Sequence, residues 1–372
     1  MATVNFSVPG AVKEAFNAVF KGKRILVTGG TGSMGKTFVH RVLSGELGTP
    51  KKVIVFSRDE AKQHDMRMSY LHRAVTTDEV IFNNFRNVLE FRIGDVRDYG
   101  DMCSALKSAD IVINAAALKQ VPTCEYFPAQ AILTNCIGAN NIARAIEENS
   151  YPVETVVGIS TDKACKPVNV MGMTKSLQER ILIAANVLSA RTRFICVRYG
   201  NVLASRGSVI PLFHDQIRNG GPITVTHPKM TRFLLTLDQA VDTVFAALRG
   251  AKAGETFIPR APAASVMNVA KALIGSRRIP IRVTGVRPGE KLHEVLVSEE
   301  EVHHCVKRGG YYVIRPMLPE LRQGKAREAN ALTREFSSGD NVLNLAATAR
   351  LLKRTRLMID DRSPAAREEF LR

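Results

Sequence analysis

The sequence predicts an α/β protein built on a doubly wound parallel sheet, with a smaller C-terminal lobe. Three observations predict this fold class. Six short runs rich in β-branched residues alternate with helical patterns between Lys23 and Gly200, a glycine-rich turn follows the first run, and the periodicity loosens after Gly200. The six runs are RILVTG, KVIVFS, LEFRIGD, ADIVINAA, ETVVGIS and RFICVRY.

These patterns divide the chain into four parts, because 372 residues exceed the usual size of one hydrophobic core. We expect an N-terminal extension over residues 1–22 and a Rossmann-type nucleotide-binding domain over residues 23–200. Residues 201–322 are expected to form the substrate-binding lobe, and residues 323–372 a linker and closing helix. Apolar residues at helical spacing predict helices at 176–188, 238–248, 266–273 and 344–353.

Composition narrows the class of protein. A hydrophobic content of 45% is typical of a globular chain. The formal charge is +17, but Lys and Arg are scattered without interleaved aromatic residues, so we expect an anionic nucleotide and no nucleic acid as partner. Because no apolar run approaches about 20 residues and the start lacks a signal pattern, we expect a cytoplasmic protein without a membrane partner. The six cysteines contain no C-x-x-C pair, which predicts neither disulfides nor a metal site.

The glycine-rich turn between the first strand and the first helix is a candidate phosphate loop. Glycine there permits the tight turn, the close approach of backbone to a pyrophosphate and the packing of helix on strand, while the helix N-terminus offers free N–H groups. Its position before five further strand runs makes it specific for a dinucleotide. The residues are Thr28, Gly29, Gly30, Thr31, Gly32, Ser33, Met34 and Gly35.

The second strand run ends in Ser57 and Arg58, where an NAD enzyme usually has an acidic residue for the ribose 2′-hydroxyl. A cation there accommodates a 2′-phosphate, so we expect NADP rather than NAD, although Asp59 could still reach the ribose. Further cofactor contacts are expected where the third and fourth strands end, since open sheets bind ligands at that edge. These residues are Asp95, Val96, Ala115 and Ala116.

The fifth strand run leads into S-T-D-K-A-x-x-P-x-N-x-M-G-x-T-K, which covers residues 160–175. Together with T-G-G-T-G-S-M-G, S-R-D-E-x-K-Q, A-A-L-K-Q-V-P, R-Y-G-N-V-x-x-S-R-G-S-V-I-P, T-x-x-x-M-T-R-F and R-P-G-E-K-L-H-E, this segment resembles the UDP-N-acetylglucosamine 4,6-dehydratases of capsular and flagellar polysaccharide biosynthesis. These enzymes are extended short-chain dehydrogenases. The resemblance extends from about Lys23 to Glu301.

The resemblance implies an NADP-dependent lyase that converts UDP-N-acetylglucosamine into a 4-keto-6-deoxy sugar nucleotide. Hydride leaves C4, water is eliminated across C5 and C6, and the hydride returns to C6; inversion at C5 stays open. Lys163 is expected to remove the C5 proton, which requires a site that lowers its pKa. Asp162 is expected to protonate the departing hydroxyl, and Thr161 to hydrogen-bond the C4 oxygen.

One position departs from the usual Tyr-x-x-x-Lys pattern of short-chain dehydrogenases. Met171 stands in place of the tyrosine and cannot take a proton, whereas Lys175 is expected to bond the nicotinamide ribose. The base for the C4 hydroxyl is therefore open between Thr161, acting as a relay to solvent, and Lys163. The resemblance also implies a set of sugar-nucleotide contacts: Lys119, Asn201, Ser208, Val209, Arg232, Arg287 and Glu290.

Two other functions compete with dehydration. A nucleotide-sugar 4-epimerase shares the oxidation at C4 but needs no Asp-Lys elimination pair, and a non-catalytic NADP sensor would explain the missing tyrosine. We also expect a homo-oligomer, at least a dimer, that pairs through Ala-rich faces of helices around 135–147 and 175–188.

Overall fold

The computed structural model describes residues 18–72, 79–203, 208–322 and 328–359. Its main feature is a large sheet whose first six strands coincide with the six predicted runs. They are β1 (Arg24–Thr28), β2 (Lys52–Ser57), β3 (Leu89–Ile93), β4 (Ile111–Asn114), β5 (Thr155–Thr161) and β6 (Arg193–Tyr199). These strands are parallel and pair in the order β3-β2-β1-β4-β5-β6. This is the order of a Rossmann-type doubly wound sheet, so the predicted fold class is confirmed.

Three later strands extend the sheet beyond β6. Strand β10 (Thr256–Pro259) pairs parallel with β6, β15 (Tyr311–Ile314) pairs antiparallel with β10, and β14 (Cys305–Arg308) pairs antiparallel with β15. All three come from the segment expected to form the substrate-binding lobe. The second half of the chain therefore contributes strands to the large sheet as well as to the smaller lobe.

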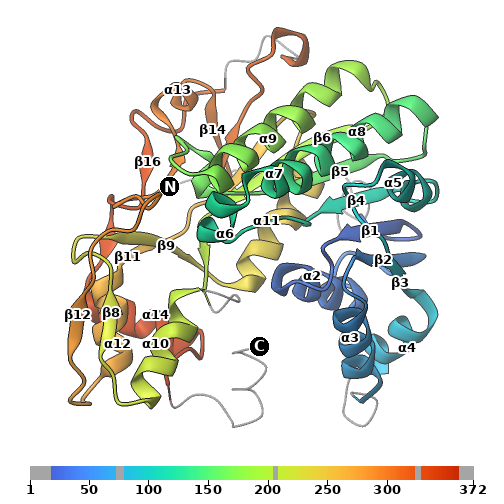
Figure 1. Cartoon of the computed structure of the whole chain (residues 1–372). Helices are drawn as coiled ribbons and strands as arrows, with labels where there is room; N and C mark the ends of the chain where they lie inside the picture. The colour runs from blue at the N-terminus through green and yellow to red at the C-terminus, as the bar shows by residue number, and fades with distance from the viewer. Residues whose placement is uncertain (1–17, 73–78, 204–207, 323–327, 360–372) are drawn as a thin grey trace, which may run out of the picture.

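Helices cover both faces of the large sheet, as Figure 1 shows. One face carries α2 (Ser33–Leu43), α3 (Glu60–His72), α4 (Glu79–Val88) and α11 (Leu237–Gly250), and the other carries α5 (Tyr99–Leu106), α8 (Gly138–Asn149) and α9 (Val170–Leu188). Alternate residues of β1 point into opposite cores, with Ile25 and Val27 on the first face and Leu26 on the second. A strand buried on both faces must be apolar throughout, which explains the continuous β-branched runs.

The smaller lobe is built from short strands and helices along the left side of Figure 1. Its strands are β7 (Asn201–Val202), β9 (Thr231–Leu235), β11 (Ala263–Ser265) and β17 (Val342–Leu343) in one sheet, and the pairs β8 (Ile223–Val225) with β12 (Ile281–Val283) and β13 (Val295–Val297) with β16 (Phe336–Ser337). Its helices are α10 (Val209–Arg218), α12 (Val266–Ile274), α13 (Glu299–Val302) and α14 (Leu345–Arg354). The four predicted helices correspond to α9, α11, α12 and α14. The helix expected before Lys21 falls mainly in residues 1–17, outside the described residues, and across the described segments no helix is long and apolar enough to cross a membrane.

A buried ion triad joins the two halves of the molecule. Arg198 of β6 donates two hydrogen bonds to Glu179 of α9, at 3.0 and 2.6 Å, and two to Glu301 of α13, at 2.7 and 2.9 Å. All three residues are less than one-tenth exposed. Burial alone would raise the pKa of Glu301, but the nearby guanidinium outweighs it and lowers that pKa. Arg198 thus holds two carboxylates from different parts of the chain inside the protein.

We expect Arg198→Ala to destabilise the protein by about 3–5 kcal/mol, because it leaves two buried carboxylates without their cation. The control is Arg144→Ala, which breaks an exposed i,i+4 pair with Glu148 on α8 and should cost far less, because water screens surface ion pairs. Urea unfolding followed by circular dichroism measures both. Equal shifts of the two midpoints would contradict a special role for the triad.

Candidate active site

The glycine-rich turn leaves the N-terminus of α2 open for an anion. Gly29 has φ +64°, and a Cβ there would stand 2.8 Å from the backbone of Ala116. At Gly35 a Cβ would stand 2.6 Å from the Cα of Gly30, so the helix can pack on the turn only without a side chain. Gly32 caps α2 without a side-chain hydrogen bond, and the first turn holds no acidic residue. These features fit a pyrophosphate bound to backbone N–H groups.

The loop after β4 is held in place from two sides. The hydroxyl of Thr28 donates to Asn114 at 2.8 Å and accepts from the N–H of Ala116 at 3.3 Å. Asn135 exchanges hydrogen bonds with both backbone groups of Leu118, at 2.9 and 3.0 Å. Asn135 lies in a π-helical segment, η2 (Ile132–Ile137), which follows α6 (Val121–Tyr126) and α7 (Pro128–Ala131). These hydrogen bonds fix the backbone of the loop that carries Ala115 and Ala116. Asn135 was not among the predicted site residues, and its only signal in the sequence is a polar residue in an apolar helical pattern.

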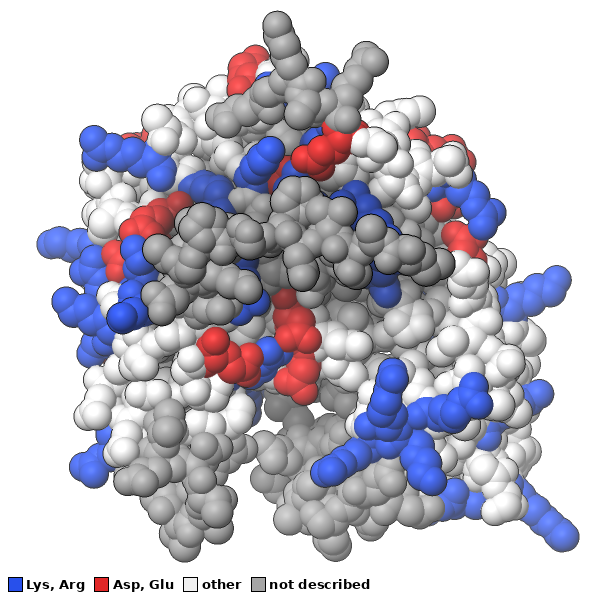
Figure 2. All heavy atoms as spheres, turned by 180° about the vertical axis from the view of Figure 1, so that it is seen from behind, with Lys and Arg blue, Asp and Glu red and all other residues white. Residues whose placement is uncertain are grey.

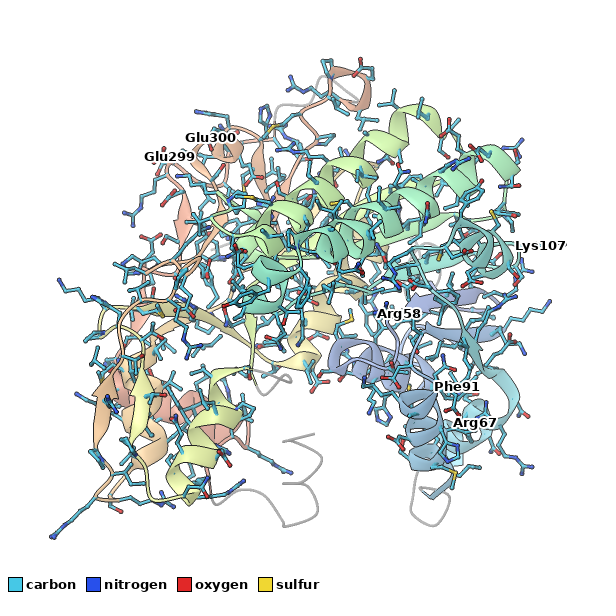
Figure 3. All side chains as sticks on the ribbon, in the orientation of Figure 1. Arg58, Arg67, Phe91, Lys107, Glu299 and Glu300 are labelled. Carbon is cyan, nitrogen blue, oxygen red and sulfur yellow. The ribbon has the colours of Figure 1, made fainter. Side chains whose placement is uncertain are left out.

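The end of β2 presents Arg58 to solvent. Its side chain is 53% exposed and forms a 3.5 Å ion pair with Asp95, a contact worth little at the surface. Burial opposes ionisation of Asp95, but hydrogen bonds from Arg97 and the charge of Arg58 prevail and lower its pKa. Asp59 accepts the N–H of Lys62 at 3.0 Å and pairs with its ammonium, so its carboxylate serves the start of α3. Arg58, labelled in Figure 3, is thus the more available of the two side chains.

The segment expected to be catalytic lies directly at the end of β5. Asp162 begins a short 3-10 helix, η3 (Asp162–Ala164), and is fully buried. Its Oδ1 atom accepts from the hydroxyl of Thr161 and the ammonium of Lys163, both at 3.0 Å. Its Oδ2 atom has no hydrogen-bond partner among the described residues. The structure therefore brings Thr161, Asp162 and Lys163 together, with one carboxylate oxygen left over.

A second carboxylate, Glu294, faces the same ammonium from the smaller lobe. Its Oε1 atom lies 3.4 Å from Nζ of Lys163 and 3.9 Å from Nε of Arg232, and its Oε2 atom lies 4.0 Å from Nζ of Lys291. Glu294 is 2% exposed. It ends the R-P-G-E-K-L-H-E segment but was not among the predicted site residues. Its presence in that motif was the one signal that could have identified it.

The protonation state of Lys163 differs from the expectation. Burial lowers its pKa, but the charges of Asp162 and Glu294 outweigh the burial and raise the pKa above the usual lysine value. The expected lowering is therefore wrong for the protein without ligands, because two carboxylates flank the ammonium where the sequence indicated one.

Lys175 and Met171 lie on α9, one turn apart. The ammonium of Lys175 is buried and donates to the carbonyl of Ile159 at 2.6 Å and to Gln178, and burial lowers its pKa to about 8. Met171 is 5% exposed and packs with Cys124 and Ala131. The methionine thus fills an apolar cluster. The ribose contact of Lys175 stays a prediction, since both of its described partners belong to the protein.

The R-P-G-E loop of the smaller lobe docks on the start of α9. Asn169 caps α9 by accepting from Gly172 at 2.7 Å and donates from its amide to the carbonyl of Gly289, also at 2.7 Å. Lys291 donates to the carbonyl of Cys165 at 2.7 Å. A Cβ at Gly172 would overlap the carbonyl oxygen of Lys163, so the helix start fits closely against the Asp-Lys turn. The loop therefore braces the segment that holds both Lys163 and Lys175.

The expected sugar-nucleotide residues lie in different surroundings. Arg287 and Lys119 are exposed, and Glu290 accepts the N–H of Arg287 across the turn at 3.4 Å. Arg232 is 9% exposed, and its Nη1 group donates to the carbonyls of Thr231 and Leu292. Its contact with a diphosphate stays a prediction.

Asn201 and Ser208 each hold a buried side-chain oxygen near the start of the smaller lobe. Neither Oδ1 of Asn201 nor Oγ of Ser208 has a hydrogen-bond partner within the described part of the chain. Ser208 caps α10 without a side-chain hydrogen bond, and Val209 is its first residue. Unpartnered buried oxygens cost free energy, so they fit a site that a polar ligand completes.

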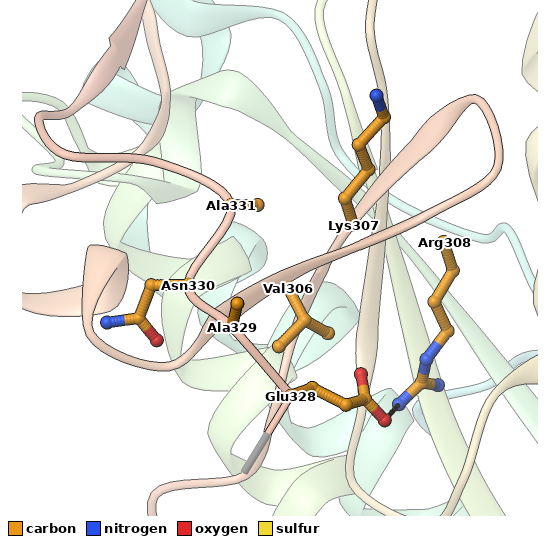
Figure 4. A pocket seen from close by; sticks show the side chains of 7 residues that line it. All are labelled: Val306, Lys307, Arg308, Glu328, Ala329, Asn330 and Ala331. Carbon is orange, nitrogen blue, oxygen red and sulfur yellow. Dashed lines mark hydrogen bonds and ion pairs between the residues drawn. The ribbon is translucent and has the colours of Figure 1, made fainter. Parts of the chain in front are cut away.

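Two surface features lie apart from these residues. Figure 2 shows Lys and Arg around the margin of one face, with a group of them at the lower right, which suits anionic ligands in general. Figure 4 shows a hollow in which Arg308 pairs with Glu328; Arg308 also pairs with Glu255. The hollow is lined by Val306, Lys307, Arg308, Glu328, Ala329, Asn330 and Ala331, none of which belongs to the candidate site.

Comparison with known proteins identifies relatives over most of the chain. A family model described as polysaccharide biosynthesis protein matches residues 25–316. A protein of Rickettsia bellii named UDP-glucose 4-epimerase is 44% identical over 344 residues, which cover 90% of this chain and 96% of the relative.

Solved structures also match most of this chain. The X-ray structure of Pen from Bacillus thuringiensis is 35% identical, with a TM-score of 0.80, and the match covers 91% of this chain and 99% of Pen. The structure of DesIV, a dTDP-glucose 4,6-dehydratase from Streptomyces venezuelae with NAD bound, has a TM-score of 0.60 over 72% of this chain and 86% of that one. At 21% identity, DesIV supports the fold alone.

Proposed function

The chain belongs to the polysaccharide biosynthesis protein family, and from this premise we propose that it is an NADP-dependent 4,6-dehydratase of UDP-N-acetylglucosamine. The observation that carries the proposal is the Asp162–Lys163 pair at the end of β5, with one carboxylate oxygen unpartnered among the described residues. An enzyme that only oxidises and reduces C4 has no use for a buried acid and base side by side. Elimination of water needs both.

Elimination can proceed with a proton that the pair already holds. Transfer of one proton from Lys163 to Asp162, over 3.0 Å, produces a neutral amine and a carboxylic acid. The amine then takes the C5 proton, which a C4 ketone has acidified. A double bond forms between C5 and C6 as the C6–O bond breaks, and Asp162 gives its proton to the hydroxyl, which leaves as water. The ion pair is restored.

Thr161 is suited to orient the sugar. Its hydroxyl donates to Asp162 in the protein without ligands, and its side chain is only partly buried, so the hydroxyl can rotate to donate to the C4 oxygen of a bound sugar instead. Met171 is enclosed by apolar side chains and holds no proton. The C4 hydroxyl must therefore give up its proton through Thr161 or Lys163.

The proposal predicts that the protein converts UDP-N-acetylglucosamine into a 4-keto-6-deoxy product and that Lys163→Ala abolishes conversion, because the acceptor of the C5 proton is lost. NMR in deuterated water measures both the product and deuterium incorporation at C5. Lys307→Ala, an exposed lysine of β14, is the control and should react as the wild type does. C5 exchange in Lys163→Ala would move the base to another residue.

A 4-epimerase is the second candidate, favoured by the name of the 44% identical relative. The same NMR experiment with UDP-glucose and UDP-N-acetylglucosamine distinguishes the two activities. An epimerase gives the C4 epimer with an intact C6 hydroxyl and no solvent deuterium at C5. Absence of turnover of either sugar would favour an NADP sensor.

NADP is the proposed cofactor because, of the two charged residues that follow β2, the cation Arg58 is more available to a dinucleotide than the carboxylate of Asp59. Asp59 is engaged with Lys62, whereas Arg58 is half exposed and only loosely paired. The turn at Gly29–Gly35 would hold the pyrophosphate, and Arg58 the 2′-phosphate. The chemistry that NADP supplies when bound is the removal of hydride from C4 and its return to C6.

We expect Arg58→Glu to weaken NADP binding far more than NAD binding, since a carboxylate repels the 2′-phosphate but can accept from a ribose hydroxyl. Calorimetric titration of both dinucleotides measures the two affinities. Lys107→Glu makes the same charge change at the end of α5, well away from Arg58 in Figure 3, and should leave the ratio unaltered. Equal losses for both cofactors in Arg58→Glu would mean that Arg58 does not read the 2′ position.

The proposed enzyme is an oligomer that pairs through α9 and the neighbouring helices. The Ala-rich faces expected to form the interface instead pack largely inward, with Ala139 and Ala145 buried and Ala185 against the core. The outer surface carries a different apolar set, each member more than one-third exposed: Tyr126, Phe127, Ile132, Leu133, Ile137, Met173, Leu177, Val187 and Leu188. An apolar surface of this extent is typical of an interface.

We predict that Leu177→Glu weakens association and lowers activity together, because a buried charge opposes pairing and α9 also carries Lys175. Light scattering and the dehydration assay measure the two effects. Leu345→Glu, at an exposed leucine of α14, is the matched control. A wild type that is monomeric at micromolar concentration and fully active would refute the coupling.

A further inference from the structure

The site contains more buried charge than the elimination step uses. Three charged side chains surround the ammonium of Lys163. Asp162 belongs to the same turn, Glu294 to the segment before β13, and Arg232 to β9. Glu294 in turn faces Lys163, Arg232 and Lys291. The proposed elimination assigns protons to Asp162 and Lys163 only. Glu294 is 2% exposed, and burial of a carboxylate is costly unless its charge has a function or a close partner.

Lys163 is the nearest cation to Glu294. The distance from Oε1 to its Nζ is 3.4 Å, against 3.9 Å to Arg232 and 4.0 Å from Oε2 to Lys291. Arg232 is occupied by two backbone carbonyls, and Lys291 by the carbonyl of Cys165. The Oε2 atom of Glu294 has no hydrogen bond to any described residue. Its charge is therefore directed mainly at Lys163.

The backbone fixes Glu294 in this position. Its N–H donates to the hydroxyl of Ser338 at 2.9 Å, and its carbonyl accepts from the N–H of Ser338 at 2.8 Å. Ser338 is fully buried and is also hydrogen-bonded to Thr231, the neighbour of Arg232. These paired bonds fix the backbone from which the side chain of Glu294 reaches Lys163.

We propose that Glu294 is a positioning residue, which holds the ammonium of Lys163 against Asp162 and keeps it protonated until the pair reacts. This inference rests on the proposed function for its catalytic meaning, but its electrostatic part does not need a substrate. Before elimination, Lys163 passes one proton to Asp162. Glu294 opposes that transfer by stabilising the ammonium, and it favours return of the pair to the charged form after water has left.

The sign of the effect follows from the charges. The pKa of Lys163 is raised, against the effect of burial, by Asp162 and Glu294 and is lowered by Arg232. Glu294→Gln keeps the shape but removes one negative charge, so the pKa of Lys163 must fall. An opposite charge within about 4–6 Å shifts a pKa by roughly 1–3 units, so we expect a fall of about one unit or more.

The first experiment measures the pKa of Lys163 without turnover. Competitive labelling of the full-length protein with acetic anhydride across a pH series, followed by mass spectrometry of the peptide, reports the neutral fraction of this lysine. Glu294→Gln should shift its labelling curve to lower pH by about one unit or more. Glu299→Gln is the control, because Glu299 lies at the outer side of α13 with a 71% exposed side chain. An unshifted curve in a folded Glu294→Gln protein would overturn the proposal.

The second experiment uses the reaction. With UDP-N-acetylglucosamine, the falling limb of kcat against pH should move to lower pH in Glu294→Gln by the same amount as the labelling curve, because the pair must keep one proton to react, and Glu294→Asp should restore part of the difference. A uniform loss of kcat without a shift of the limb would indicate a structural role and overturn the inference. If the wild type converts no UDP-hexose, the proposed function fails, but the labelling result still decides whether Glu294 sets the protonation of Lys163.

Discussion

The buried triad of Arg198, Glu179 and Glu301 is the interaction on which the site depends. It lies directly behind the carboxyl end of β5, because the hydroxyl of Ser160 donates to the same oxygen of Glu179 that Arg198 bonds. Arg198 also donates to the carbonyl of Leu296 in β13 at 2.9 Å. One side chain thus fixes the large sheet, the helix that carries Lys175 and the strand that follows Glu294. Because three ions are desolvated together, only one relative position of these elements satisfies all of them.

That constraint explains how two distant segments of the chain share one reacting group. Lys163 belongs to the turn after β5 and Glu294 to the smaller lobe, yet their charged atoms lie 3.4 Å apart. Their approach is reinforced by the bond from Asn169 to the carbonyl of Gly289. On the other side, Gly200 lies so close to Asp162 that a Cβ there would be 3.1 Å from Oδ2. The backbone at Gly200 therefore approaches the unpartnered oxygen of Asp162 closely, which a residue with a side chain would hinder.

The sequence predicted the parts of the structure that local patterns determine. The six runs became β1 to β6 because both faces of each are buried, and Gly29 occupies the left-handed conformation that a tight turn requires. The pairing of β10, β14 and β15 with the large sheet could not be predicted from the sequence, since the residues of a short strand do not specify which strand it pairs with. Arg232 illustrates the same limit in the site. As a motif residue it was expected at a diphosphate, which stays a prediction, but only the fold reveals that its Nη1 group donates to the carbonyls of Thr231 and Leu292. Glu294 was missed for a related reason, because its function depends on a lysine 131 positions earlier in the chain.

The enclosed methionine and the paired lysine belong to one chemical arrangement. A tyrosine at position 171 would need a hydrogen-bond partner or water for its hydroxyl, and the cluster of Cys124 and Ala131 offers an apolar wall. With no phenol, the reaction that we propose requires the proton of the C4 hydroxyl to pass through the same small group of side chains that handles the C5 proton. If one lysine handles both protons, a nearby carboxylate that does not itself react can keep the pKa of that lysine raised. Glu294, held by its backbone and surrounded by Lys163, Arg232 and Lys291, has the geometry of such a charge. In the proposed reaction, Met171 and Glu294 therefore belong to a single way of controlling where protons reside.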